Sequence, residues 1–207
     1  MKERRVPVDH EVGVMERQPL TTSDDAPLWV FGYGSIVWNV GFEHERVLVP
    51  VCARGYRRRF YQGSTDHRGT PALPGRTATL EVCDKDFIVW GAAYEVSAEN
   101  RASVIEYLEI REKQYDSRIE LDLYESDAPD AEPVIRDAVT YIATSADANL
   151  NWLGPADDIA DQIARASGPS GDNCDYLYNL TAALRELGCR DEGLEQLERD
   201  VRAIRGD

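Results

Sequence analysis

Strand-like and helix-like patterns occupy different parts of this chain. Alternating or β-branched runs predict strands at 28–31, 46–53, 56–62, 77–82, 88–96, 118–124 and 134–143. Helical periodicity predicts helices at 98–113, 157–166, 174–187 and 191–204. Because the strands do not alternate regularly with helices, a doubly wound parallel sheet is disfavoured. The predicted fold is α+β, with a small curved or barrel-like mixed β-sheet flanked by helices.

The chain length suits one domain with a hydrophobic core. Compact domains commonly hold about 100–200 residues, and this chain has 207. Residues 1–26 carry charges, Pro7, Pro19 and a polar run at 21–25, a composition typical of a loose terminus. We therefore expect a flexible N-terminal extension over 1–26 and a single domain over 27–207.

The charge balance limits the partners. There are 23 Lys and Arg residues against 38 Asp and Glu, a formal net charge of −15, which repels nucleic-acid phosphates and anionic membranes. No apolar run approaches the roughly 18–20 residues that cross a bilayer. The four cysteines form no CxxC pair, and no secretory segment precedes them. We expect a cytoplasmic protein with reduced thiols and neither a nucleic-acid nor a membrane partner.

Several kinds of catalytic site are disfavoured. The three histidines have no metal-ligand spacing, so no metal is expected, and no P-loop sequence is present. Ser64, Asp66 and His67 lie within one short stretch, whereas the members of a catalytic triad converge from different directions. They are interpreted as a local turn network. No cofactor is expected.

A glycine pair follows the first predicted strand, in the stretch FGYGS at 31–35. It resembles the start of a dinucleotide fingerprint, but Tyr33 is bulky and the third glycine is missing. Backbone N–H groups exposed by Gly32 and Gly34 could instead bind a carboxylate or a developing oxyanion. The alternative is an ordinary tight turn at a strand end.

Glu112 stands out in the first predicted helix. Helical spacing places it in the same stripe as Val104 and Leu108, where burial would raise its pKa and make it a better proton acceptor near neutral pH. The alternative is that the helix ends before Glu112 and the side chain turns into water beside Arg111. Glu109 and Lys113 are expected to form a solvated i,i+4 pair.

Several stretches match one protein family. They are VFGYGS at 30–35, RRFYQGSTDHRG at 58–69, PGR at 74–76, VWG at 89–91, REK at 111–113, LGPA at 153–156 and GPSG at 168–171. With these motifs, which span about 28–187, the sequence resembles the ChaC-like γ-glutamylcyclotransferases, which act on glutathione. The resemblance implies a barrel-like fold without metal or nucleotide. It implies that Glu112 is the catalytic proton acceptor.

The resemblance also implies a substrate site and a reaction. The backbone of Val30, Phe31, Gly32, Tyr33, Gly34 and Ser35 would hold the γ-glutamyl end. Tyr141 would hydrogen-bond the substrate, unless it is simply a strand tyrosine. The substrate would be glutathione, and the products 5-oxoproline and cysteinylglycine. The alternatives are a cyclotransferase for other γ-glutamyl amines or dipeptides, and an inert binding protein on the same fold.

Two features qualify the resemblance. The family commonly has two glycines and a tyrosine after its REK motif, where this chain has Gln114-Tyr115-Asp116, so the loop beside the base should be stiffer or differently shaped. A basic cluster could supply a partner for the glycine carboxylate of glutathione. Its members are Arg54, Arg57, Arg58, Arg59, Arg68 and Arg76.

Overall fold

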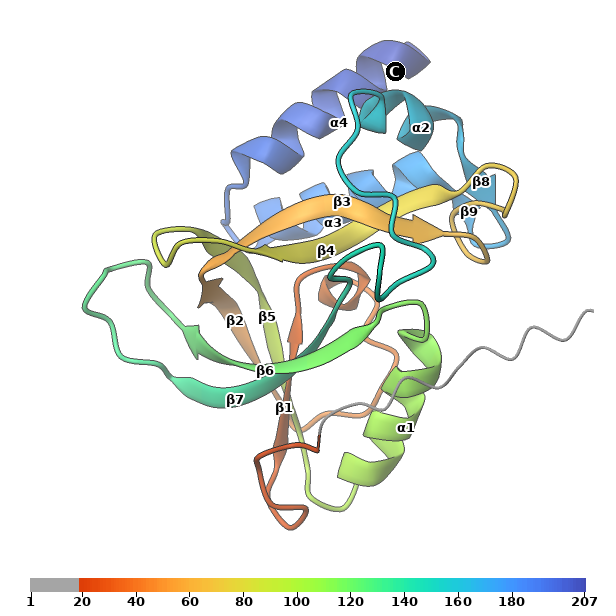
Figure 1. The fold of residues 1–207 in the computed structure, drawn as a ribbon. Coiled ribbons are helices and arrows are strands. Elements are labelled where there is room, and N and C mark those ends of the chain that lie inside the picture. The colour runs from red at the N-terminus through yellow and green to blue at the C-terminus, as the bar shows by residue number, and fades with distance from the viewer. Residues whose placement is uncertain (1–18) are drawn as a thin grey trace, which may run out of the picture.

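The computed structural model describes residues 19–207, and its secondary structure follows the expected order (Figure 1). The strands are β1 (Leu28–Gly32), β2 (Arg46–Arg54), β3 (Tyr56–Ser64), β4 (Gly75–Val82), β5 (Ile88–Val96), β6 (Ser117–Tyr124), β7 (Ile135–Ile142), β8 (Ser167–Gly168) and β9 (Gly171–Asp172). The helices are the 3-10 turn η1 (Ser35–Val37) and α1 (Arg101–Arg111), α2 (Ile159–Arg165), α3 (Asn173–Glu186) and α4 (Glu192–Arg205).

Five strands close into a barrel in the order β1-β5-β2-β6-β7. β1 pairs antiparallel with β5, with Val30 opposite Tyr94, and parallel with β7, with Val30 opposite Val139. The parallel contact joins the first and last strands of the barrel and makes the sheet mixed. Closure removes exposed strand edges, which would otherwise invite aggregation. The predicted α+β fold with a barrel-like mixed sheet is confirmed.

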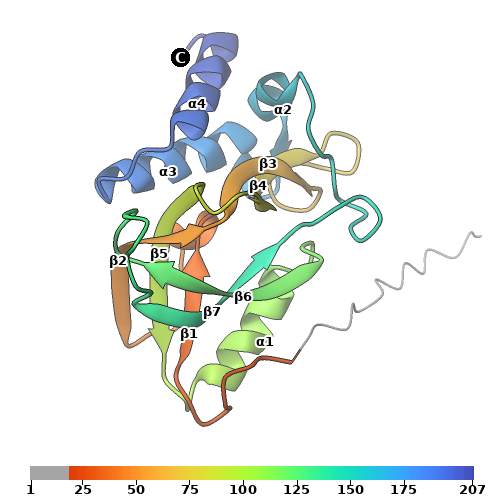
Figure 2. The same cartoon turned by 60° about the vertical axis from the view of Figure 1, so that its left-hand side comes forward.

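β3 and β4 form a separate two-stranded ribbon between the barrel and the C-terminal helices. α2, α3 and α4 lie on the side of this ribbon away from the barrel (Figure 2). One hydrophobic core runs through these layers, and it includes Val51 of the barrel, Leu80 of the ribbon, Leu180 of α3 and Val201 of α4. The ribbon therefore buries side chains on both faces, which fixes its place over one end of the barrel.

α1 packs against the barrel through a second core. Val104 and Leu108 are buried beside Val30 and Val139. The helix was predicted to continue to residue 113, but it ends at Arg111. Glu112 is its C-cap residue, with φ −98° and ψ 23°, so the chain leaves the helical path at the proposed catalytic residue.

Arg101 binds the chain just before β1. Its side chain is 2% exposed, and the guanidinium donates to the carbonyl oxygens of Thr22 (3.1 Å) and Ala26 (3.2 Å). Residues 1–18 of the expected N-terminal extension lie outside the described residues. Across residues 19–207, every helix is too short or too polar to span a bilayer.

Candidate active site

A pocket of about 350 Å³ opens between the barrel and the ribbon. The loop after β1, the end of α1 with the residues that follow it, β4, β7 and the start of α3 all contribute to its wall. The lining of the pocket includes Phe31, Tyr33, Gly34, Ser35, Ser64, His67, Arg68, Tyr107, Arg111, Glu112, Lys113, Tyr115, Tyr141, Ser170 and Tyr176.

Glu112 lies in the wall of this pocket. Its side chain is 13% exposed, and Oε1 lies 3.1 Å from Nε of Arg111. The sequence left two alternatives for Glu112, and the structure combines one feature of each. The helix does end before Glu112, and the carboxylate does lie beside Arg111, but the side chain is largely shielded from water.

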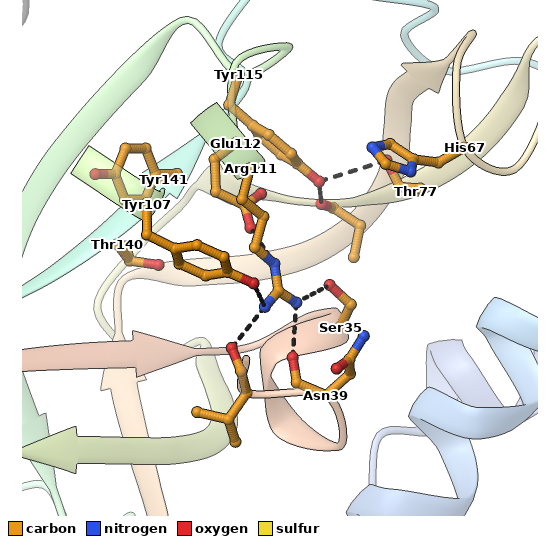
Figure 3. Close-up of polar contacts among 12 residues, drawn as sticks. Ser35, Asn39, His67, Thr77, Tyr107, Arg111, Glu112, Tyr115, Thr140 and Tyr141 are labelled. Carbon is orange, nitrogen blue, oxygen red and sulfur yellow. Dashed lines mark hydrogen bonds and ion pairs between the residues drawn. The ribbon is translucent and has the colours of Figure 1, made fainter. Parts of the chain in front are cut away.

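Arg111 joins the end of α1 to the loop after β1. Its Nη2 atom donates to Ser35 Oγ (3.0 Å) and to the Asn39 carbonyl oxygen (2.7 Å), and Nη1 donates to the Val40 carbonyl oxygen (2.6 Å). Figure 3 shows the guanidinium between Glu112 and this loop. One side chain thus fixes the distance between the acidic group and the glycine-rich turn.

The FGYGS turn contributes four of its residues to the pocket: Phe31, Tyr33, Gly34 and Ser35. The N–H groups of Gly34 and Ser35 take part in none of the turn and loop hydrogen bonds of residues 19–207. A Cβ at position 34 would lie 2.8 Å from the Tyr176 hydroxyl oxygen. Glycine is therefore required there by a close approach, and it leaves backbone donors beside the cavity.

Val30 and Gly32, whose backbone was expected in the substrate site, are not among the residues that line the pocket, and their backbone role stays a prediction. Side chains alternate along a strand, so the Val30 side chain points to the opposite face from that of Phe31. Val30 is fully buried against α1 and β7. Gly32 faces Ile36, whose Cγ2 atom would lie 2.7 Å from a Cβ at position 32.

Two buried tyrosines, Tyr33 and Tyr176, and the partly buried Tyr115 lie in the pocket wall with the acidic group. Burial raises the pKa of Tyr33 and of Tyr115 well above the ordinary value, and the negative charge of Glu112 adds to both shifts. Burial also raises the pKa of Tyr176 to about 12, again with a contribution from Glu112. All three phenols stay neutral near pH 7 and can donate hydrogen bonds. The Tyr33 hydroxyl donates to the Tyr141 carbonyl oxygen (2.6 Å), and the Tyr176 hydroxyl accepts the Ala78 N–H (3.3 Å).

Tyr141 lines the pocket as expected, but its hydroxyl already has a partner. It donates to Glu109 Oε1 (3.1 Å), which also forms an ion pair with Arg118 (2.7 Å). Glu109 was expected to pair with Lys113, and this was wrong, because Lys113 Nζ lies 2.9 Å from Asp66 Oδ2. Helical spacing alone does not reveal these partners from β6 and from the loop after β3.

The segment Gln114-Tyr115-Asp116, where the chain departs from the family that it resembles, is held by hydrogen bonds. The Gln114 carbonyl oxygen accepts from Gln62 Nε2 (2.9 Å) and Asn149 Nδ2 (3.0 Å). The Tyr115 hydroxyl donates to the Ala78 carbonyl oxygen (2.7 Å). Asn149 Nδ2 also donates to Asp116 Oδ1 (3.0 Å). These contacts agree with the expectation of a stiff segment beside Glu112.

Of the basic cluster at 54–76, Arg68 alone lines this pocket. Its Nη1 atom donates to the Asp172 carbonyl oxygen (3.1 Å). The other five are engaged elsewhere: Arg54 with carbonyl oxygens at 126–129, Arg57 over the Phe87 ring, Arg58 with Tyr33, Trp90 and Asp191, Arg59 with Glu81, and Arg76 with Phe60, Gly154 and Gln162.

Ser64 and His67 form local contacts. Ser64 Oγ accepts the Arg68 N–H (3.0 Å), and His67 Nδ1 lies 3.2 Å from Ser170 Oγ, while His67 Nε2 and Asp66 are 3.8 Å apart. The interpretation as a turn network rather than a triad agrees with these contacts. Within residues 19–207, no three His, Cys, Asp or Glu side chains are grouped so as to hold a metal ion.

Sequence reasoning missed Tyr176 and the linking role of Arg111. Tyr176 lies in the first turn of α3 with the spacing of a core residue. Tyr176-Leu177 is among the stretches that match the family, but the match alone does not separate a pocket tyrosine from a buried one. Arg111 was considered only as a neighbour of Glu112. Its position beside Glu112 was a usable signal, because a side chain next to a functional carboxylate often orients it.

The fold and the site define a small mixed β-barrel protein with one shielded carboxylate facing a glycine-rich turn. Residues 28–204 match the family model described as ChaC-like protein, and the chain belongs to this family, as the sequence motifs implied. Gamma-glutamylcyclotransferase 2-3 of Arabidopsis thaliana is 47% identical over 181 residues, covering 86% of this chain and 89% of the relative. Glutathione-specific gamma-glutamylcyclotransferase 1 of Homo sapiens is 40% identical over 183 residues, covering 85% and 79%.

A solved structure agrees with this assignment. The crystal structure of the glutathione-specific γ-glutamyl cyclotransferase from yeast superposes with a TM-score of 0.78 at 29% identity. The match covers 87% of this chain and 97% of the yeast chain.

Proposed function

We propose that this protein is a glutathione-directed γ-glutamylcyclotransferase that uses Glu112 as its general base. The observation that carries the proposal is the shared pocket, whose wall includes both Glu112 and the turn at Gly34 and Ser35. Within residues 19–207, the N–H groups of that turn take part in no turn or loop hydrogen bond. Similar proteins from Arabidopsis, human and yeast are named as γ-glutamylcyclotransferases. The four cysteines are unpaired, which suits a reducing cytoplasm.

The chemistry requires little from the protein. In a γ-glutamyl amide the α-amine and the γ-carbonyl carbon belong to one molecule, so attack of the amine nitrogen on that carbon closes a five-membered ring. The C–N bond to the leaving nitrogen then breaks as that nitrogen takes up a proton, which the base can return after removing it from the α-ammonium group, and 5-oxoproline and cysteinylglycine are released. Well-oriented intramolecular reactions reach effective molarities of about 10⁵–10⁸ M, so no nucleophilic side chain is needed.

Each requirement has a candidate group in the pocket. Glu112 accepts the proton that the α-ammonium group must lose before it attacks. The N–H groups at Gly34 and Ser35 stabilise the carbonyl oxygen as it becomes an oxyanion. Phe31 and Tyr33 hold the γ-glutamyl end, and Tyr141 lies beside it. Arg68 and Lys113 give the pocket positive charge for the substrate carboxylates.

The test is an assay for 5-oxoproline release with glutathione, γ-glutamyl-alanine and γ-glutamyl-ethylamide as separate substrates. We expect glutathione to give the largest kcat/KM. Glu112→Gln keeps the size of the side chain but cannot accept the proton, so turnover should fall about 10²-fold or more. Wild-type turnover in a folded Glu112→Gln variant would remove Glu112 from the mechanism. Faster release from γ-glutamyl-alanine would assign a different substrate, and no release from any substrate would leave an inert binding protein.

A further inference from the structure

Arg58 is a buried arginine that lies outside the pocket but contacts its wall from behind. Its side chain is 2% exposed. Nε donates to the Tyr33 carbonyl oxygen (3.0 Å) and Nη2 to the Trp90 carbonyl oxygen (2.6 Å). Nη1 forms an ion pair with Asp191. The guanidinium is thus held on three sides, by the FGYGS turn, by β5 and by the start of α4.

The contact with Tyr33 fixes the direction of the next amide. The Tyr33 carbonyl and the Gly34 N–H belong to one peptide unit, and in a trans peptide these two groups point in opposite directions. Within residues 19–207 the cis peptide bond is Val49–Pro50, so the Tyr33–Gly34 bond is trans. With the carbonyl directed at Arg58, the N–H of Gly34 is directed away from Arg58.

The direction away from Arg58 is the side of the active-site pocket. Gly34 lines that pocket, whereas Arg58 lines a separate cavity of about 200 Å³ beside α4. The Tyr33–Gly34 peptide unit therefore lies between Arg58, which binds its carbonyl oxygen, and the active-site pocket, which Gly34 lines. A guanidinium on the carbonyl oxygen also polarises the peptide unit, because linked hydrogen bonds strengthen one another, and this makes the Gly34 N–H a better donor.

Asp191 connects this arrangement to the C-terminal helix. It is the N-cap residue of α4, where its Oδ1 atom accepts the Leu194 N–H (3.0 Å), and its Oδ2 atom pairs with Arg58. One carboxylate thus holds both the helix start and the arginine. The position of α4 is in this way coupled to the backbone donors of the pocket.

We propose that Arg58 is a positioning residue that, held by Asp191, orients the Gly34 N–H toward the developing oxyanion. This inference rests on the proposed function, because it assigns the N–H a role in γ-glutamyl cyclisation. A hydrogen bond from this N–H to the substrate oxygen is stronger in the transition state, where the oxygen carries negative charge, than in the bound substrate. Its loss therefore lowers kcat and leaves KM nearly unchanged, whereas mere loosening of the fold lowers the amount of active protein and the midpoint of unfolding.

The test is Arg58→Lys, which keeps a buried cation for Asp191 but carries its three N–H donors on one nitrogen and cannot span the acceptors that Nε, Nη1 and Nη2 reach. We expect kcat on glutathione to fall about tenfold or more, since loss of a whole oxyanion donor costs about 10²–10³-fold. KM should change by less than about threefold. The matched control is Arg59→Lys on the same strand, whose arginine pairs with Glu81 (2.8 Å) and is 34% exposed; its kcat should stay at the wild-type level. A folded Arg58→Lys protein with wild-type kcat, or with raised KM alone, would overturn the inference.

A second measurement does not depend on the Arg58 variant folding. In ¹⁵N-labelled Glu112→Gln protein, saturation with glutathione should move the Gly34 amide resonance downfield, because its N–H gains an acceptor. If resonances of Lys113 and Ser35 move while that of Gly34 does not, the Gly34 N–H does not face the substrate and the inference fails. If wild-type protein releases no 5-oxoproline from glutathione, the proposed function itself fails. This result differs from the one that contradicts the role of Arg58, in which wild-type protein is active.

Discussion

Arg111 Nη2 donates to Ser35 Oγ at 3.0 Å, so the residue before Glu112 is bound to the turn that Glu112 faces. The same guanidinium also binds the carbonyl oxygens of Asn39 and Val40. The acidic group and the backbone donors come from segments almost eighty residues apart in sequence. The Arg111 side chain therefore holds the two segments in their relative position.

Arg111→Lys should therefore lower both kcat and the free energy of unfolding. A lysine cannot reproduce the guanidinium fork that reaches Ser35, Asn39 and Val40 together. We expect kcat on glutathione to fall at least about tenfold, because a misplaced base transfers protons poorly. The unfolding free energy should fall by about 1.5–3 kcal/mol, the usual net contribution of hydrogen bonds to a charged group. Turnover and urea unfolding measure the two effects.

Ser35→Ala separates the two possible roles of the serine. It removes one acceptor of Arg111 and leaves the two carbonyl acceptors in place, so its effect should be clearly smaller than that of Arg111→Lys. An equal or larger loss of kcat would mean that Ser35 acts on the substrate directly, and the orienting role assigned to Arg111 would then be wrong.

Arg68→Met tests recognition of the leaving end. A guanidinium in the pocket wall favours a leaving group that ends in a carboxylate. KM for glutathione should rise about tenfold, the effect of losing about 1.4 kcal/mol of binding. KM for γ-glutamyl-ethylamide, whose leaving amine has no carboxylate, should not change. Arg57→Met is the control, since Arg57 lies over the Phe87 ring away from this pocket. Equal changes for both substrates would remove Arg68 from this role.

The sequence predicted the elements of this fold well and their mutual contacts poorly. Strand and helix patterns depend on local periodicity, and each predicted strand is present with ends shifted by at most two residues. The end of α1 was misplaced because Glu112 continues the helical stripe by spacing, while the chain turns there to reach the pocket. The Glu109–Lys113 pair failed because partners from β6 and from the loop after β3 compete for both side chains.

The sequence predicted those parts of the candidate site that lie within a single local segment. Glu112 and the FGYGS turn are visible in the sequence as a stripe and a motif. Arg58 could not be distinguished from Arg57 and Arg59, because three adjacent arginines look alike until the strand assigns each a face. A motif also does not tell which of its side chains point to a cavity, whereas strand alternation places the Phe31 side chain in the pocket wall and the Val30 side chain on the opposite face.

The buried tyrosines predict late ionisation at alkaline pH. Burial raises the pKa of Tyr176 from 10.0 to about 12, and it raises the pKa of Tyr33 and Tyr115 well above 10.0. Because the folded-state pKa lies above the unfolded value, the stabilisation is complete below pH 10 and is lost as pH rises through the folded pKa. Absorbance at 295 nm should show a late phase that coincides with unfolding. Tyr176→Phe should reduce the amplitude of that phase, and an unchanged late phase would contradict the assignment.

Glu198 predicts the acid dependence of stability. It is 4% exposed on α4, and its carboxylate binds Arg185 of α3 (2.5 Å) and Arg202 (2.8 Å). Burial by itself would raise the pKa of Glu198, but the hydrogen bonds and charges of the two arginines outweigh it and lower the pKa below 4.5. The folded-state pKa is depressed, so this stabilisation is present above about pH 4.5 and is lost as pH falls through the folded pKa.

Glu198→Gln should lower the unfolding free energy at pH 7 by about 1–2 kcal/mol, because both arginines are partly exposed and can turn toward water. The difference from wild type should shrink below about pH 4, where the wild-type carboxylate is protonated as well. Glu195→Gln is the control, because Glu195 pairs at 3.5 Å with Arg190, whose side chain is 76% exposed, and its removal should cost less than about 1 kcal/mol. Urea unfolding of wild type and the two variants at pH 7 and pH 3.5 measures these unfolding free energies. If the difference in unfolding free energy between wild type and Glu198→Gln is the same at both pH values, the charge of Glu198 does not join α3 to α4.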